Sequence, residues 1–264
     1  EWHRQLYFQD RAGRCDVLEA DDLPAPLHMT ASLARFRILS WSEKYAIGRA
    51  MFAVIRMGRA GRQRLHDISF GDWLRRQRQP QRAIERFWIP ITVSAINEWP
   101  DQMAADAALQ VFQEGLLAHE NAYAMGLANV PLTDLYAPAI ERIEAAGGTV
   151  RMGISAEGFE AGRRRINALQ TDEGPIEPEV FISALPFDRL AKLITPAMAE
   201  VDARLAHLDK LDVSPILGVH LWYDQPVTDL PHVALVDSPL QWIFNKGITD
   251  QPGGTLAYHI HGVL

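Results

Sequence analysis

The side chains in this sequence that could take part in chemistry are mainly aromatic rings. The chain has 7 tryptophans, 6 tyrosines and 10 phenylalanines. An aromatic wall buries a hydrocarbon at about 25 cal/mol per Å² of apolar surface and attracts a developing carbocation by about 0.5 to 2 kcal/mol per ring. We expect most of these rings to be core residues. The others would line a site for a long hydrocarbon, suited to removal of a hydride or a hydroxyl group.

The sequence gives little indication of a metal site, a nucleotide-binding site or a hydrolytic active site. His259 and His261 lie two apart on an expected strand and face the same side, but no third ligand stands at a metal-binding spacing, so we expect no metal site. The sequence contains no dinucleotide-binding G-x-G-x-x-G, P-loop, H-E-x-x-H or G-x-S-x-G motif. The scattered histidines are interpreted as structural or surface residues: His28, His66, His119, His207, His220 and His232.

Composition indicates a globular protein. With 264 residues, 48% hydrophobic and 22% charged, the chain is long enough for one large or two ordinary domains. The net charge of −7 argues against nucleic acid as a partner. The single cysteine, Cys15, excludes an internal disulfide and suits a reducing compartment. No apolar run reaches the roughly 18 residues of a membrane span, and we expect a cytoplasmic protein.

The two ends of the sequence predict an internal fragment. The chain opens at Glu1 without an initiating methionine, and its first residues lack the apolar core of a signal peptide. Residues 258–264 have the character of a strand that is cut short.

The beginning of the chain is expected to be extended. Residues 5–20 are predicted to form short strands joined by a turn at 11–14. An apolar connection follows at 23–29, where two prolines bar a helix. It is either a packed loop or a surface element that dips into a membrane. Arginines cluster between residues 56 and 86, either as a solvated helix face or as a contact for anionic lipid headgroups.

Residues 30–125 are predicted to be mainly helical. Ser40 and Glu43 have the spacing of a capping box and predict a helix over 41–59. Other helices are expected to start at Ser69, after Pro80, and at Asp101 as the cap of a long helix.

From residue 131 the pattern changes. A helix over 131–146 should end at Gly147-Gly148, and a short strand should follow at 149–152. The next expected elements are a hairpin between 165–169 and 180–186, with its turn near 172–174, and a helix over 196–208. A mixed or antiparallel sheet is predicted from four late strands, at 216–223, 233–236, 241–245 and 256–260.

Five motifs occur in an informative order. They are the Pro-rich segment Leu23 to Leu27, Trp88-Ile89-Pro90 with Ala95-Ile96-Asn97 and Pro100, the helix-to-Gly-Gly element Ala139 to Val150, the strand end Ala184-Leu185-Pro186, and Val219-His220 followed by Gln241-Trp242-Ile243-Phe244. In this order they resemble the squalene-associated FAD-dependent oxidoreductases, the hydroxysqualene dehydroxylases. These enzymes are relatives of phytoene desaturases and flavin amine oxidases. The resemblance extends from about Leu23 to the end of the chain.

The resemblance implies an α+β or α/β fold that is part of a two-domain, Rossmann-like FAD-binding flavoprotein. Residues 1–130 would be the mainly helical part of the substrate domain. Residues 131–195 would be a segment of the FAD-binding domain, and residues 196–264 the truncated mixed-sheet part of the substrate domain.

The resemblance also implies site residues, although it assigns no catalytic ones. Ala156 would pass the adenine end of FAD, and Ala184, Leu185 and Pro186 would lie near the cofactor. The glycine fingerprint and the C-terminal FAD-contacting segment are absent from this sequence, so we expect the chain by itself to bind FAD poorly or not at all. The residues expected near the substrate are Trp88, Pro90, Asn97, Trp99, Trp222 and Trp242.

The hypothesis from the sequence is the central part of an FAD-dependent oxidoreductase that converts hydroxysqualene to squalene, in squalene and hopanoid biosynthesis. Its expected partners are a lipophilic isoprenoid and the inner face of a membrane, touched peripherally. A carotenoid (phytoene-type) desaturase or a flavin amine oxidase on the same scaffold is the nearest alternative. An alternative of another class is a non-catalytic lipid-binding module built on Pro24–Met29 and its arginines.

Overall fold

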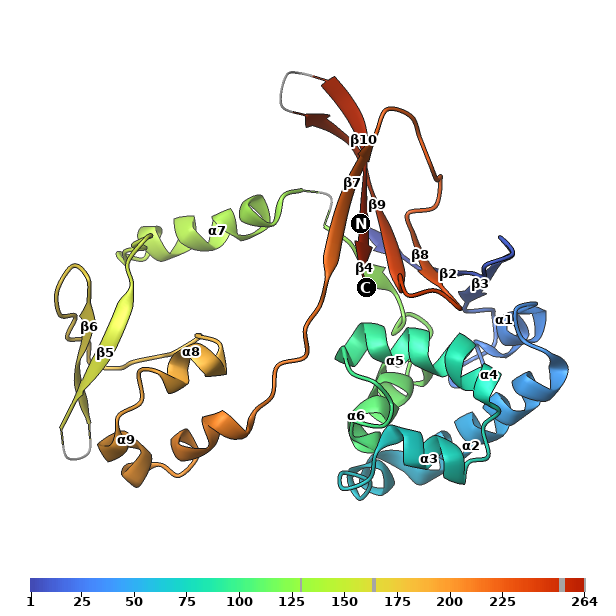
Figure 1. Ribbon diagram of the computed structural model, residues 1–264, viewed down its shortest axis with the longest axis horizontal. Coiled ribbons are helices and arrows are strands. Elements are labelled where there is room, and N and C mark those ends of the chain that lie inside the picture. Colours follow the sequence, from blue (N-terminus) through green and yellow to red (C-terminus); the bar gives the residue numbers. More distant parts are fainter. Residues whose placement is uncertain (129, 163–164, 252–254, 264) are drawn as a thin grey trace. The chain divides into compact units, whose positions relative to one another are not determined.

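The computed structural model describes residues 1–128, 130–162, 165–251 and 255–263 and forms two compact units (Figure 1). Unit 1 comprises Glu1–Asn129 and Ser214–Leu264, and unit 2 comprises Val130–Val213. The sequence placed a boundary at 195/196. In the structure the segment from 196 to 213 belongs to unit 2 and not to the part that forms the sheet.

Unit 1 is built on a six-stranded sheet with the order β3-β2-β8-β9-β10-β7. The pairing of β2 with β8 is parallel and the other pairings are antiparallel. The predicted mixed sheet is therefore confirmed, and the N-terminal hairpin extends it. The strands are β2 (Gln5–Gln9), β3 (Cys15–Glu19), β7 (Gly218–Tyr223), β8 (His232–Leu235), β9 (Trp242–Gln251) and β10 (Thr255–Val263), with β1 (Trp2–His3) and β4 (Met125–Gly126) as a separate pair.

The helices of unit 1 gather near one end of these strands (Figure 1), and they confirm the prediction that residues 30–125 are mainly helical. Two of the segments are π-helical, a rare geometry that often occurs at functional sites. The elements are α1 (Thr30–Arg35), α2 (Trp41–Gln63), α3 (Phe70–Arg76), α4 (Gln81–Ala83), the π-helix η1 (Ile84–Trp88), α5 (Ile89–Ile96), α6 (Ala105–Gln110) and the π-helix η2 (Val111–Leu117).

Two predicted helix starts are confirmed by their caps. The Ser40 side chain accepts a hydrogen bond from the Glu43 amide, and the Glu43 carboxylate accepts one from the Ser40 amide, which completes the capping box of α2. The Ser69 side chain accepts a hydrogen bond from the Asp72 amide at 3.0 Å and caps α3.

The predicted cap at Asp101 is wrong. Helix α6 begins four residues later, at Ala105. Residues 100–103 are instead fixed against the start of α3, where Gly71 donates to the Pro100 carbonyl at 2.7 Å and Phe70 donates to the Met103 carbonyl at 2.9 Å. The Asp101 carboxylate accepts a hydrogen bond from Arg75. These tertiary bonds outweigh the local capping signal.

Unit 2 contains α7 (Leu132–Ala145), β5 (Ala156–Ala161), β6 (Ile166–Thr171), α8 (Phe187–Ala191), α9 (Pro196–Val201) and the 3₁₀ helix η3 (Leu205–Lys210). The predicted helix before Gly147 is confirmed, and Gly147 adopts φ +84°, as a left-handed helix end requires.

Three expectations for unit 2 are wrong. Residues 149–152 form no strand, and β6 pairs with β5, the segment just before it, instead of with 180–185. Val180 and Ile182 are 73% and 92% exposed, so the apolar run that suggested a strand is open to solvent at these two positions. The helix expected over 196–208 is interrupted between α9 and η3.

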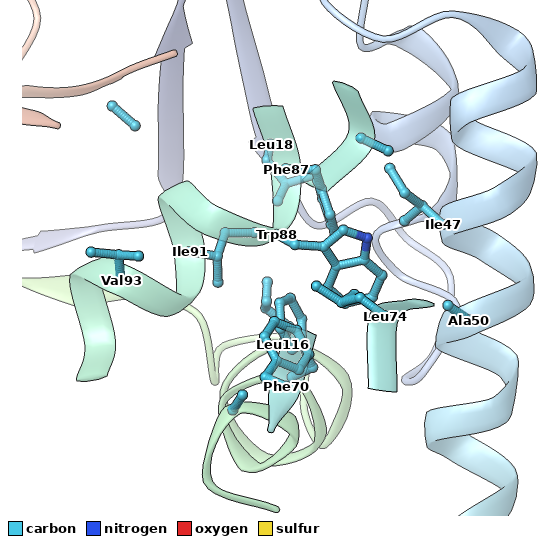
Figure 2. Close-up of a cluster of buried hydrophobic side chains, with 14 of the residues drawn as sticks. Leu18, Ile47, Ala50, Phe70, Leu74, Phe87, Trp88, Ile91, Val93 and Leu116 are labelled. Carbon is cyan, nitrogen blue, oxygen red and sulfur yellow. The ribbon is translucent and has the colours of Figure 1, made fainter. Parts of the chain in front are cut away.

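The core of unit 1 lies between its helices and the sheet. Rings and aliphatic side chains from η1, α3 and η2 pack around Trp88, which is fully buried (Figure 2). Ile47 and Ala50 join from α2, and Leu18 joins from β3. This core holds α5 in a fixed position relative to the sheet.

Candidate functional site

The aromatic cluster that the sequence singled out is mainly a packing cluster. The Trp88 ring lies 4.7 Å from Phe112 and 5.3 Å from Phe87, measured between ring centroids. Its indole N–H donates to Gln79 Oε1 at 2.9 Å. Because Trp88 is fully buried, the structure gives it a role in the core, and its predicted contact with substrate stays a prediction.

Helix α5 links two other predicted residues, Pro90 and Asn97, to the C-terminal part of unit 1. Pro90, in its first turn, accepts a hydrogen bond from the Trp242 indole at 3.3 Å. Asn97 ends the helix in the left-handed conformation, with φ +59°, and its side-chain amide donates to the Ser214 carbonyl at 2.8 Å. Trp99, just beyond, is 56% exposed. The structure thus joins Pro90 with Trp242 and ties α5 to the chain entering β7.

Trp222 lies on β7, the edge strand of the sheet, and is 48% exposed. The strand register shows whether Trp222 and Trp242 lie on the same face of the sheet, because directly paired residues on neighbouring strands share a face. Trp222 pairs with His259 of β10, and Trp242 of β9 pairs with Val263. His259 and Val263 are four apart on β10 and face the same side, so Trp222 and Trp242 lie on one face.

An apolar cavity of about 280 Å³ lies between the Pro-rich segment and the helices of unit 1. Its inner wall carries Phe87 of η1 and Leu116 of η2, so both π-helical segments contribute to it. Its volume is near the lower end of the roughly 300–1,000 Å³ of small-molecule sites. It can therefore enclose part of a long hydrocarbon. The lining residues are Leu18, Pro26, Leu27, Met29, Thr30, Leu33, Gly48, Met51, Phe52, Ile55, Phe87, Leu116 and Leu117.

A second cavity of about 520 Å³ shares Pro26, Ile55 and Leu117 with the first. Gly58 and Arg59 also line it. Gly58 interrupts α2 with φ +60°, a conformation that favours glycine. The sequence pointed to residues 23–29 as an apolar surface element, but the six predicted substrate residues do not line either cavity.

The arginine cluster is partly neutralised by carboxylates. Arg62 is buried and pairs with Glu114 at 2.9 Å, and Arg86 pairs with Asp237. Hydrogen bonding to Arg75 lowers the pKa of the Asp72 carboxyl below its ordinary value. The cluster is thus partly an internal ion-pair network.

The predicted cofactor residues lie in unit 2. Ala156 is the first residue of β5 and pairs with Thr171. Ala184 and Leu185 precede α8 without regular structure, and Pro186 is its N-cap. Their proximity to FAD stays a prediction. Among the described residues, no group of three histidine, cysteine or carboxylate side chains is arranged to hold a metal ion.

No protein-family model matches the chain. It is 26% identical over 251 residues to 15-cis-phytoene desaturase of Synechococcus elongatus, covering 92% of this chain and 53% of that protein. It is 27% identical over 215 residues to the chloroplastic/chromoplastic 15-cis-phytoene desaturase of Solanum lycopersicum, covering 80% and 36%. The chain thus spans about half or less of the length of these curated relatives.

The fold resembles those of solved oxidoreductases. An oxidoreductase from Methanosarcina mazei superposes with a TM-score of 0.70 at 14% identity, covering 99% of this chain and 60% of that one. Putrescine oxidase bound to putrescine gives a TM-score of 0.64 at 12% identity, with 100% and 59% covered. The curated relatives are thus phytoene desaturases, and the solved structures share the fold of this chain. They do not single out the squalene-related enzymes that the motifs resemble.

Proposed function

We propose that the full-length protein is an FAD-dependent oxidoreductase that acts on a long lipophilic isoprenoid, and that unit 1 supplies the substrate side of its site. The observation that carries this proposal is the apolar cavity of about 280 Å³ lined by both π-helical segments. It occurs in a chain that matches phytoene desaturase along 92% of its own length. Burial of apolar surface is the main way to bind such a substrate.

The described residues do not make a complete FAD site. A dinucleotide needs a glycine-rich turn for its phosphates, and this sequence has no such motif. Unit 2 fits a segment of a larger cofactor domain, because α7 leaves an apolar face exposed that includes Leu135, Tyr136 and Ile140. When bound, the flavin would accept or supply a hydride. We expect this chain alone to lose added FAD on desalting, and retained flavin absorbance would contradict that expectation.

Within this class we propose hydroxysqualene, converted to squalene, as the substrate. The ordered motifs from Leu23 to Phe244 support it. A phytoene-type carotene is the second candidate, because the curated relatives described above are phytoene desaturases. The two reactions differ in direction: the alcohol loses oxygen and is reduced, whereas the carotene loses hydrogen and is oxidised.

The test is turnover by the full-length flavin-loaded protein, with products identified by mass spectrometry. Hydroxysqualene would be supplied with a reductant for the flavin, and phytoene with a quinone acceptor. We expect squalene from the first reaction. Desaturated carotene alone would select the second candidate. Formation of neither product by a protein that holds flavin would overturn the proposed class.

We also infer that unit 1 contacts a membrane surface through α2 and the Pro-rich segment. Exposed apolar side chains recur at helical spacing along α2, at Trp41, Tyr45, Phe52 and Ile55. Leu27, 54% exposed, lies beside Phe52 in the cavity wall. Such a stripe with exposed arginines nearby suits a helix that lies in the lipid interface. Among the described residues, none of the helices combines the length and apolar character that crossing a bilayer requires.

Liposome co-sedimentation tests this contact, with phosphatidylcholine vesicles with and without phosphatidylserine. Leu27→Asp should reduce the bound fraction several-fold, because it places a charge at the apolar surface. Ile182→Asp is the matched control, since Ile182 is 92% exposed in unit 2. Equal sedimentation of the two variants would contradict the inferred contact.

A further inference from the structure

One face of the sheet carries a row of rings that ends at the edge strand. Four directly paired residues form the row, one on each of β8, β9, β10 and β7: His232, Phe244, His261 and His220. The last two rings are stacked, with centroids 4.2 Å apart and planes 10° apart. Beside them, Trp222 stacks on His259 at 4.7 Å and 8°. Four rings of β7 and β10 therefore form a continuous platform on the face that also carries Trp242.

The platform contains a hydrogen bond between two imidazoles. His220 Nδ1 and His259 Nε2 are 2.9 Å apart. A neutral imidazole has one N–H donor and one acceptor nitrogen, so one ring donates and the other accepts. Whichever ring donates, its outer nitrogen is an acceptor and the outer nitrogen of the other ring is an N–H donor. The pair thus presents one donor and one acceptor, at His220 Nε2 and His259 Nδ1.

The stack depends on a small residue beneath it. A Cβ at Gly218 would lie 2.9 Å from His261 Nε2, too close for an ordinary contact, so glycine makes room for the imidazole. His220 is exposed and His259 is half-buried, which leaves the pair accessible to a ligand lying on the sheet.

Two rings of the platform have a lowered pKa, which favours their neutral form. Burial, followed by the neighbouring His220, lowers the pKa of His259, and the same causes lower the pKa of His261. The positive charge of Lys246 on β9 lowers both pKa values as well. The neutral forms of His259 and His261 can take part in hydrogen bonds without carrying a charge, which suits an apolar site.

We propose that the His220–His259 pair binds a hydroxyl group of the isoprenoid substrate and makes the site prefer an alcohol over the corresponding hydrocarbon. This inference rests on the proposed function. A hydroxyl group has one donor and two acceptor lone pairs, so it can either donate to the acceptor nitrogen of the pair or accept from its N–H donor. A hydrocarbon that covered the pair would make no hydrogen bond to either outer nitrogen, and a buried polar group without a partner weakens binding.

The rings around the pair hold the hydrocarbon beside that hydroxyl group. Trp222 and Phe244 supply flat apolar surfaces on the same face of the sheet. The carbon that bears the hydroxyl would lie over rings that also favour positive charge through cation–π attraction. His220 and His259 are therefore specificity-determining residues in this proposal.

The test compares the binding of hydroxysqualene and squalene to the full-length protein in the same detergent micelles. Equilibrium binding is followed by tryptophan fluorescence. We expect hydroxysqualene to bind about tenfold more tightly, the order expected for one net hydrogen bond. In His220→Phe/His259→Phe the ring stacking is kept but the hydrogen bonds are lost, and the ratio should fall to about one. His207→Phe, at an exposed histidine of unit 2, should leave the ratio at about ten.

A second measurement uses the unsubstituted protein, so it does not depend on the folding of the variant. The NMR signals of the carbon-bound ring protons of His220 and His259 should shift with hydroxysqualene and stay in place with squalene. Equal affinities for the two compounds, or a double variant that keeps the tenfold ratio, would refute the role of the pair while leaving an isoprenoid site intact. In that case the rings only stabilise the sheet edge. Binding of neither compound would instead refute the proposed function.

Discussion

A substitution of Trp88 tests whether this residue belongs to the hydrophobic core, as the structure indicates, or to the substrate site. Its indole N–H bonds to Gln79 Oε1 at 2.9 Å, and Gln79 Nε2 in turn donates to the Ala46 carbonyl at 2.9 Å. Trp88 is fully buried, and Gln79 is only 8% exposed. Trp88→Phe would leave the Gln79 oxygen buried without a partner and remove part of a packed ring.

The expected loss can be worked out from these two effects. An unpaired buried acceptor costs about 1–3 kcal/mol. Phenylalanine has about three fewer ring atoms, and each buried CH₂-sized group contributes about 0.8 kcal/mol, so packing accounts for about 2 kcal/mol more. We expect Trp88→Phe to lower the free energy of unfolding by about 3–5 kcal/mol, measured by urea titration with far-UV circular dichroism.

Two further variants show whether the reasoning is correct. Trp99→Phe is the matched control, because Trp99 is 56% exposed, and it should change the free energy of unfolding by less than about 0.5 kcal/mol. Adding Gln79→Leu to Trp88→Phe removes the unpaired oxygen. The losses in free energy of unfolding of the two single variants should therefore add up to about 1 kcal/mol more than the loss of the double variant. A loss below about 1 kcal/mol for Trp88→Phe would refute its role in the core.

Three other predictions concern caps, ion pairs and pH. Ser40→Ala should lower the free energy of unfolding by about 1 kcal/mol in urea titration, because it removes the capping hydrogen bond of α2. Asp237→Asn should lower it by about 1–2 kcal/mol, since Arg86 and Asp237 are 15% and 24% exposed and form a partly buried pair; an unchanged transition would mean that the pair contributes nothing. The pKa of Asp202 should be about 2 by NMR titration, because the Arg204 side chain donates hydrogen bonds to its carboxylate. The pKa is lowered on folding, so this stabilisation is present above pH 3.8, the ordinary value, and is lost as the pH falls toward 2; a midpoint near 3.8 would show that the pair does not form in solution.

The features predicted best from the sequence are those decided by neighbours along the chain. The starts of α2 and α3 follow from Ser40 with Glu43 and from Ser69 with Asp72, which need only a three-residue spacing. Asp101 has a similar local signal but does not cap a helix, because the Pro100 and Met103 carbonyls accept hydrogen bonds from α3. Contacts between distant segments decided that case.

Strand pairing was harder to predict because an apolar run does not identify its partner. Residues 180–185 have the composition of a strand, yet β6 pairs with β5, which precedes it directly. The four late strands of the sheet were predicted because each alternates with a clear turn, although the parallel contact between β2 and β8 could not be found from spacing.

The residues of the candidate site were also hard to predict, because contacts between distant segments bring them together. The sequence placed His259 and His261 on one face of a strand, but it interpreted His220, 39 residues before His259, as an isolated histidine. Only the register of β7 against β10 brings the three rings together. The apolar cavity likewise combines the segment at 23–29 with residues from α2, η1 and η2, which no single spacing reveals.

In the proposed site the apolar cavity and the ring platform would recognise different features of the substrate. The cavity among the helices is apolar, and hydrophobic burial is non-directional, so it can distinguish chain length and shape but hardly one functional group from another. The ring platform offers one donor and one acceptor, and hydrogen-bonding groups reject a ligand that cannot pair with them far more strongly than apolar contacts do. The Trp242 bond to Pro90 ties β9 to α5, and β10 follows β9 in the sheet. The platform is thus supported by the packed helices, which is the rigidity that discrimination between an alcohol and a hydrocarbon requires.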